Sequence, residues 1–199
     1  IHCLDLIRDK AKTYQTLASH NMLVPKSSEV TSVSELSEAI HHHGYPNRSV
    51  VCKPTTGRGG RDIFVLIGRD NPPDWLGRGA RERRVKEFDI DEMIFDHSNF
   101  GRLIVMPVFS TPAYDFDIVK SSENQVVTIP RERLNPVGIP FDGNRIARNE
   151  EIQQYCASLA DILGLSAIHD ADLLSDVDGK PMLLEVNPRP SGSMAVSLF

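Results

Sequence analysis

Hydrophobic residues recur at helical spacing in three segments of this chain. The first pattern predicts a helix that begins after Asp9 and ends near Asn21, with apolar residues three and four positions apart. A shorter helix is predicted over residues 34–43, where a serine and a glutamate mark its start. The third pattern is the clearest, because Asn149 is a suitable N-cap and Gly164 a suitable end.

Short apolar runs and alternating patterns predict strands in much of the remaining chain. The predicted strands cover residues 48–54, 63–68, 102–109, two halves of 114–134, 169–176 and 181–187. A polar turn at 121–124 separates the two halves, and Asp178-Gly179 is a strong hairpin signal before the last strand. Residues 68–84 are rich in proline, glycine and arginine and predict a surface loop, whereas 85–95 suit either a strand or a helix.

The order of these elements predicts an α+β fold in two lobes, with antiparallel pairing in the second lobe. We expect a first lobe over residues 1–70, an irregular linker over 71–104, and a second lobe over 105–199.

Candidate chemistry is densest at the end of the chain, in the stretch MLLEVNPRPSGS at residues 182–193. Glu185 and Asn187 are two positions apart in a predicted strand, so their side chains point to the same face. Asp172 lies across the predicted hairpin and can stand beside Glu185. Few, hard oxygen ligands suit Mg²⁺, and the neighbouring Arg189 suggests an anion near it. The alternative is a polar strand end that only caps a turn.

A second candidate is the stretch VVCKPTTGRGG at residues 50–60. Lys53 leaves the end of an apolar strand, and Gly57, Gly59 and Gly60 allow backbone amides to approach an anion closely. This combination predicts a phosphate clamp, although neither GxxxxGK[ST] nor GxGxxG is present. Standing alone, it would equally suit a flexible hairpin with an exposed lysine.

A third candidate is the stretch VMPVFSTPAYDFDIV at residues 105–119. Met106 to Phe109 are apolar and broken by a proline, so the free edge of this strand could hold a flat base. Asp115 and Asp117 follow as a pair on one face. An ordinary core strand is the alternative.

Bulk properties narrow the classes of partner. The chain is 40% hydrophobic and 25% charged, with a net charge of −5, which argues against a nucleic-acid partner. No apolar run is long enough to predict a membrane segment. Cysteines stand only at positions 3, 52 and 156, which fits a reducing cytoplasm and no disulfide framework.

Read in order, these stretches resemble the ATP-grasp superfamily, particularly its carbamoyl-phosphate-synthase-like branch of carboxylate–amine ligases. The resemblance covers nearly the whole chain. It runs from RDKAKTYQTLASHNMLVPKS, through the lysine–glycine stretch and the 105–119 stretch, to LLEVNPRPSGS, whose Glu-x-Asn-Pro-Arg is the most specific part. The resemblance implies a two-lobed ATP-grasp fold with a nucleotide cleft between the lobes. It also implies an ATP-dependent, ADP-forming ligase that joins a small carboxylate to an amine through an acylphosphate.

The resemblance also implies roles for particular residues. Lys10 and Lys53 would contact the nucleotide phosphates, and one or two Mg²⁺ ions, or Mn²⁺, would be bound to Asp172, Glu185 and Asn187. Arg189 would stabilise the transferring phosphoryl group, and Arg131 would face the acyl substrate or the γ-phosphate. The remaining implied nucleotide contacts are Gly57, Gly59 and Gly60 over the phosphates, and Met106, Pro107, Val108 and Phe109 at the adenine.

Two positions depart from the pattern of the family. Ala113 stands where a glutamate usually holds the ribose, and Asp62 stands where a further glycine is common. Members also usually carry a preceding α/β domain, so a missing N-terminal domain or a homo-oligomer is expected to complete the acceptor site. The alternative to a ligase is a non-catalytic, regulatory nucleotide-binding module on the same fold.

Overall fold

A computed structural model describes residues 3–57, 62–70, 83–85, 101–134 and 143–198. The chain divides into two compact units, one made of Ile1–Val24 with Phe109–Phe199 and the other of Pro25–Val108. The first unit therefore joins the two ends of the chain. Each unit is built around its own five-stranded sheet.

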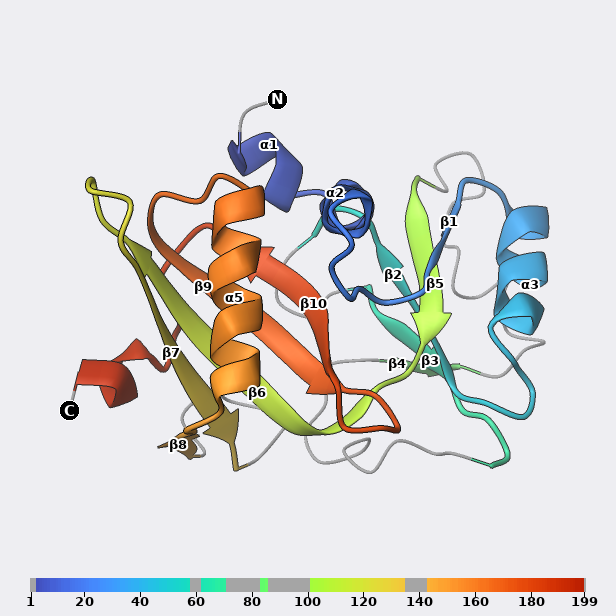
Figure 1. The fold of residues 1–199 in the computed structure, drawn as a ribbon. Helices are drawn as coiled ribbons and strands as arrows, with labels where there is room; N and C mark the ends of the chain where they lie inside the picture. Colours follow the sequence, from blue (N-terminus) through green and yellow to red (C-terminus); the bar gives the residue numbers. More distant parts are fainter. Residues whose placement is uncertain (1–2, 58–61, 71–82, 86–100, 135–142, 199) are drawn as a thin grey trace. The chain divides into compact units, whose positions relative to one another are not determined.

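The unit of residues 25–108 holds a mixed sheet with strand order β1-β5-β2-β3-β4 (Figure 1). All neighbouring strands are antiparallel except β3 and β4, which run parallel. Its elements are β1 (Ser28–Val30), α3 (Val33–His42), β2 (Val50–Pro54), β3 (Phe64–Leu66), β4 (Arg83–Val85) and β5 (Leu103–Pro107).

Helix α3 covers the apolar core of this unit. Its N-cap is Ser32, whose hydroxyl accepts from the Glu35 amide at 3.2 Å, while Glu35 accepts in return from the Thr31 amide at 2.7 Å. The helix delivers Leu36, Ala39 and Ile40 to the core. The core is completed by buried strand residues: Val30, Val50, Cys52, Phe64, Leu66 and Val105.

Any side chain at position 68 would clash with the backbone of this unit. A Cβ at this position would meet the Arg48 backbone and lie 2.5 Å from the amide nitrogen of Ser49. The Gly68 amide also donates to the buried Ser49 hydroxyl at 2.9 Å, which fixes the approach of the two segments. Gly68→Ala is therefore expected to lower the free energy of unfolding by about 3 kcal/mol. Chemical denaturation measures this, with Gly164→Ala as control, since a Cβ there meets nothing within 4 Å and only the φ of 63° opposes it.

The unit that joins the chain ends is built on an antiparallel sheet with strand order β10-β9-β6-β7-β8 (Figure 1). Its strands are β6 (Ser110–Lys120), β7 (Val126–Arg133), β8 (Asn144–Ile146), β9 (Ala167–Ser175) and β10 (Pro181–Asn187). Its helices are α1 (Cys3–Ile7), α2 (Lys10–Ser19), α5 (Glu150–Ile162) and the short 3₁₀ helix η3 (Met194–Leu198).

Helix α5 lies over one face of this sheet, as Figure 1 shows. The Thr128 hydroxyl on β7 donates to the Gln153 carbonyl on α5 at 3.4 Å. Ile118 pairs with Thr128 across the strands and so points to the same face. Because side chains alternate along a strand, Asp115 and Asp117 of β6 point to the opposite face. The sheet thus has an apolar face under α5 and a charged face on its other side.

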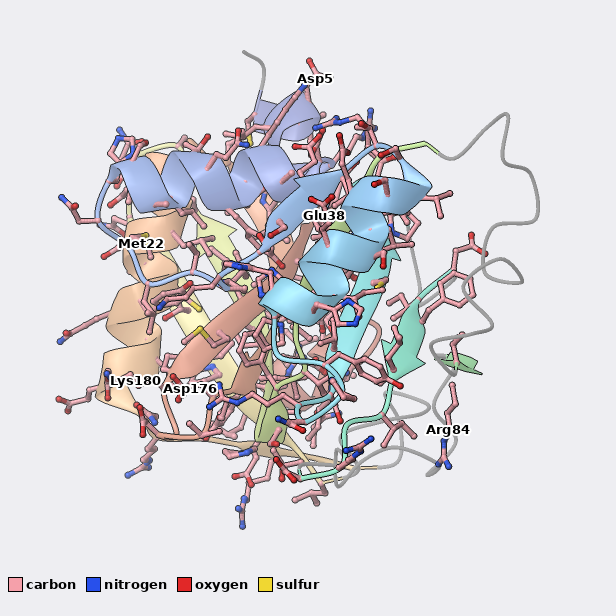
Figure 2. All side chains as sticks on the ribbon, turned by 90° about the vertical axis from the view of Figure 1, so that its right-hand side faces the viewer. Asp5, Met22, Glu38, Arg84, Asp176 and Lys180 are labelled. Carbon is pink, nitrogen blue, oxygen red and sulfur yellow. The ribbon has the colours of Figure 1, made fainter. Side chains whose placement is uncertain are left out.

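The β9–β10 hairpin turns through Asp176 to Lys180, both labelled in Figure 2. The Asp176 carboxylate accepts from the amides of Asp178 and Lys180 at 2.9 and 2.8 Å. Gly179 has a φ of 78°, a conformation that glycine adopts without strain. The strands are in register from Pro181↔Ser175, with a β-bulge between Leu183 and Glu185.

Several sequence predictions are confirmed. Asp9 caps α2 and Asn149 caps α5, each through a hydrogen bond to the amide three residues on. The strand pairs β6–β7 and β9–β10 form as expected, and Glu185 pairs directly with Asp172. The fold is α+β, as predicted.

Other predictions are wrong in detail. The second helix is capped by Ser32 rather than Ser34. The Ser32 hydroxyl accepts from the Glu35 amide, and the Glu35 carboxylate accepts in return from the Thr31 amide. Residues 83–85, part of which was predicted as loop, form β4, and the short elements α1, β1 and β8 were not predicted. Residues 1–24 group with the sheet of 109–199, whereas the sequence placed them with 25–70. Within the described residues, no helix has the length and apolar character to cross a membrane.

Candidate functional site

Carboxylates collect on the charged face of the β6–β9–β10 sheet. Cross-strand register places Asp115 beside Asp172 and Asp172 beside Glu185. The adjacent row places Asp117 beside Asp170, and Asp170 beside Asn187. Directly opposed residues share a face, so these side chains converge. We call this set the acidic face: Asp115, Asp117, Asp170, Asp172, Glu185 and Asn187.

Arg131 neutralises one row of the acidic face. It forms an ion pair with Asp117 at 2.8 Å, and both side chains are fully buried. Its Nη1 group also donates to the Ser197 hydroxyl at 3.4 Å, and Ser197 in turn donates to Asp117 at 2.6 Å. A substrate could reach Arg131 only if Ser197 and the segment around it moved away.

Arg133 neutralises the neighbouring row. Its Nε donates to the Asp115 carboxylate and its Nη2 donates to the Asp172 carboxylate, each at 2.5 Å. Burial lowers the pKa of this guanidinium, but Asp172 and Asp115 outweigh burial and the net shift is upward. Arg133 is therefore a permanent cation held between two acids.

Lys10 comes to the acidic face from α2. Asp9 is the N-cap of this helix, so Lys10 is its first residue. The side chain of Lys10 is buried, whereas Lys12 is exposed. The Lys10 ammonium lies 3.3 Å from the Glu185 carboxylate. The sequence had linked Lys10 with the nucleotide and Glu185 with a metal; the structure brings the two residues together.

The segment after β10 also contacts this face. Ser193 is buried and its hydroxyl donates to Asp115 at 3.3 Å. Arg189 is 57% exposed, and its Nη1 lies 3.9 Å from Asp170. Arg189, one of the predicted site residues, therefore lies beside the acidic face with much of its side chain exposed to solvent.

Crowding of the acids raises their proton affinity. Burial raises the pKa of Asp170 to about 7, with Asp115 adding to the rise and Arg189 opposing it. The pKa of Asp172 is also raised, by burial first and then by its acidic neighbours, against the pull of Arg133. Oδ1 of Asp170 is buried without a hydrogen-bond partner in the described structure. These two carboxylates of the acidic face therefore hold a proton to higher pH than isolated carboxylates do.

The raised pKa of Asp170 predicts a pH-dependent stability. Its folded-state pKa of about 7 exceeds the ordinary value of 3.8, so the folded protein holds this proton more tightly than the unfolded chain. Raising the pH through that window is expected to lower the free energy of unfolding. Asp170→Asn cannot ionise, so its advantage over the wild type should grow between pH 4 and pH 7 and stay constant above.

Urea unfolding in the presence of a chelator, from pH 4 to pH 8, measures this. The matched control is Asp178→Asn, an exposed carboxylate in a turn, which should show no such growth. A constant difference for Asp170→Asn across the range would contradict the prediction.

The unit of residues 25–108 carries the second set of predicted residues. Lys53 pairs with Ile104 on β5 and is buried, on the face of β2 opposite Val50 and Cys52. Gly57 follows the strand, whereas Gly59 and Gly60 lie outside the described residues. Asp62 has a φ of 57°, the region that favours glycine, which explains why a glycine suits that position.

The predicted adenine segment spans the boundary of the two units. Met106 and Pro107 end β5, and the Val108 amide donates to the Ser49 carbonyl at 3.1 Å. Met106 and Phe109 are buried, whereas Pro107 and Val108 are partly exposed. Ala113, the residue in place of the expected glutamate, is buried at 2% exposure.

Sequence reasoning missed part of the acidic face. Arg133, Ser193 and Ser197 were not singled out, although Asp115 and Asp117 were read as a same-face pair. The alternation of Arg131 and Arg133 carries the same signal, because two arginines at strand spacing opposite two aspartates predict buried ion pairs. Ser193 and Ser197 carry no comparable signal.

Comparison with known proteins points to one family. A family model described as "ATP-grasp in the biosynthetic pathway with Ter operon" matches residues 99–199. The D-alanine–D-alanine ligase B of Clostridium perfringens is 24% identical over 196 residues, which cover 98% of this chain and 61% of that protein. The chain thus spans less than two thirds of this curated relative.

Solved structures show the same fold. The ADP complex of N5-carboxyaminoimidazole synthetase from Staphylococcus aureus has a TM-score of 0.71 at 16% identity, covering 98% of this chain and 48% of that one. A biotin carboxylase from Campylobacter jejuni, solved with a β,γ-ATP ligand, also has a TM-score of 0.71, at 15% identity, over 98% of this chain and 43% of that one.

Proposed function

Because the chain belongs to the ATP-grasp family described for the biosynthetic pathway with the Ter operon, we propose that it is the ATP-binding part of a carboxylate–amine ligase. The reaction would release ADP and phosphate. The observation that carries this proposal is the β9–β10 hairpin, which sets Asp172, Glu185 and Asn187 on one face beside Lys10. The relative that is a D-alanine–D-alanine ligase, and the ADP complex among the fold neighbours, support the same reaction class.

The donor set of the hairpin suits a hard divalent cation. No group of three or more histidine, cysteine, aspartate or glutamate side chains in the described ranges is arranged to hold a metal by itself. Two carboxylates and an amide oxygen instead match Mg²⁺, which completes its shell with water and nucleotide phosphates. The buried Oδ1 of Asp170, without a partner in the described structure, is a further oxygen beside them. We therefore assign one or two Mg²⁺ ions, or Mn²⁺, to Asp172, Glu185 and Asn187.

The chemistry needs positioning and charge neutralisation more than covalent help. An oxygen of the substrate carboxylate would attack the γ-phosphorus of ATP, and ADP would leave, giving an acylphosphate. The amine nitrogen would then attack the acyl carbon, phosphate would leave, and the amine would lose a proton to solvent. A bound Mg²⁺ would offset the charge repulsion between ATP and the carboxylate. Lys10, Lys53 and Arg189 are the cations of this chain that we assign to the phosphates.

The test is a phosphate-release assay on the full chain. Mg-ATP is mixed with a pool of small carboxylates, a pool of amines, and both together, and phosphate is expected only with both. Release that needs neither would indicate an ATPase and contradict the proposal. Tight nucleotide binding without turnover over broad pools would favour a non-catalytic nucleotide-binding module, to which the loss of the expected glutamate at Ala113 also points.

Lys53 gives a separate prediction for nucleotide binding. Removing a charge-assisted contact to phosphate, as in Lys53→Met, is expected to weaken ATP binding by about ten- to hundredfold. Isothermal titration calorimetry measures the affinity. Lys26→Met, which removes an exposed lysine from the same unit, should leave the affinity unchanged. Equal affinities for the two variants would remove Lys53 from the nucleotide site.

A further inference from the structure

Arg133 contacts Asp172, a carboxylate of the proposed metal site. It bonds Asp115 through Nε and Asp172 through Nη2, and Nη2 also contacts Asp115, so a single guanidinium joins β6 and β9 to β7. Such charge-assisted bonds are among the stronger side-chain contacts. The side chain of Arg133 is 26% exposed, in contrast to the fully buried Arg131 on the same strand. Arg133 therefore has room to move, and Arg131 does not.

Both oxygens of Asp172 are engaged in this arrangement. Oδ1 accepts from Arg133, and Oδ2 accepts from the Asn187 amide nitrogen at 3.1 Å. The same nitrogen lies 3.3 Å from Asp170 Oδ2. A divalent cation that binds Asp172 must therefore replace hydrogen-bond donors that already satisfy it. Arg133 is the only one of these donors that carries a positive charge, so it opposes the cation most strongly.

Resting on the proposed function, we propose that Arg133 is a positioning residue that occupies Asp172 until a divalent cation takes its place. Because both Nε and Nη2 contact Asp115, the bond to Asp172 can break while Asp115 still holds the guanidinium. Arg133 thereby weakens binding of a bare metal ion to the acidic face. The site then favours a cation that arrives together with nucleotide phosphates. The phosphate oxygens are additional ligands of the cation, and their binding compensates for the broken Arg133–Asp172 bond.

The experiment measures the affinity of the full chain for Mn²⁺ without nucleotide, from the electron paramagnetic resonance signal of free Mn²⁺. Arg133→Gln is expected to bind Mn²⁺ about ten- to hundredfold more tightly than the wild type, because one charge-assisted bond no longer competes. Arg133→Lys should lie between the two. Arg145→Gln is the matched control: Arg145 pairs with Glu132 at 2.7 Å on the same sheet and is 63% exposed, so its loss should change the affinity less than about twofold.

The site of the tightened binding is fixed by a second variant. Adding Asp172→Asn to Arg133→Gln should abolish the gain, since Asp172 is the carboxylate that Arg133 covers. Thermal unfolding of every variant checks that the fold is kept, and Arg133→Lys carries the test if Arg133→Gln does not fold. Unchanged or weaker Mn²⁺ binding in the folded Arg133 variant, or no binding in it at all, overturns the proposal.

The two proposals fail separately. The Mn²⁺ measurement uses neither ATP nor substrates, whereas the ligase proposal fails if the wild type releases no phosphate with any pair of carboxylate and amine. Tightened Mn²⁺ binding in a protein without turnover would leave Arg133 as a metal competitor in a non-catalytic nucleotide-binding module.

Discussion

Replacing Glu185 with glutamine is expected to lower kcat for ATP-dependent phosphate release by about 10²-fold or more. The change keeps the shape of the side chain and removes the charge that we assign to the metal. It also removes the ion pair with Lys10, whose ammonium lies 3.3 Å from Glu185. ATP should still bind within a fewfold of the wild-type affinity, because Lys53 is unaffected. Phosphate release and calorimetric titration together separate these two quantities.

Glu132→Gln is the matched control. Glu132 belongs to the same sheet but pairs with Tyr114, one position out of step with Asp115, so it points away from the acidic face. Its replacement should leave kcat unchanged. Equal losses of affinity and turnover in Glu185→Gln would show that Glu185 holds the nucleotide rather than the metal of the reaction.

The second large effect concerns stability. Arg131→Met is expected to lower the free energy of unfolding by about 3–5 kcal/mol, because it leaves Asp117 buried without its cation. Both side chains of the pair have no exposed surface, and the Ser197 hydroxyl alone cannot neutralise a carboxylate. Urea denaturation measures the loss.

Two further variants test the cause of that loss. Arg131→Met combined with Asp117→Leu should recover most of the stability, since an apolar pair replaces both charges. Arg145→Gln breaks an exposed pair and should cost less than about 1 kcal/mol. A double variant as unstable as Arg131→Met would mean that packing of the arginine, and not the stranded charge, is responsible.

The sequence was most informative where local patterns decide the structure. The Asp178-Gly179 turn predicts the β9–β10 hairpin, and Asp172 pairs with Glu185 as expected, although this pairing also requires the bulge between Leu183 and Glu185, which the sequence did not predict. The helix N-caps at Asp9 and Asn149 could also be predicted from the sequence, because a capping side chain accepts a hydrogen bond from an amide only three residues away.

Longer-range contacts were beyond such patterns. Arg133 meets Asp172 across 39 positions of the chain, and Ser197 meets Asp117 across 80. No local spacing predicts either contact, because both depend on strand order β10-β9-β6-β7 and on the path of the segment after β10. The grouping of residues 1–24 with the second half of the chain has the same origin: Tyr14 of α2 donates to the Leu184 carbonyl of β10 at 2.7 Å.

The bulge in β10 decides which side of the sheet its polar residues face. Leu183 pairs with Leu173, and in an uninterrupted ladder Leu184 would then face Asp172 and Glu185 would pair with Ala171. Glu185 would enter the apolar layer under α5, since Ala171 pairs with Phe116 there. One additional residue at Leu184 reverses this phase, and the Tyr14 hydroxyl clamps that residue to α2. Deletion of Leu184 alone would therefore move the side chains of Glu185 and Asn187 from the acidic face to the apolar face under α5.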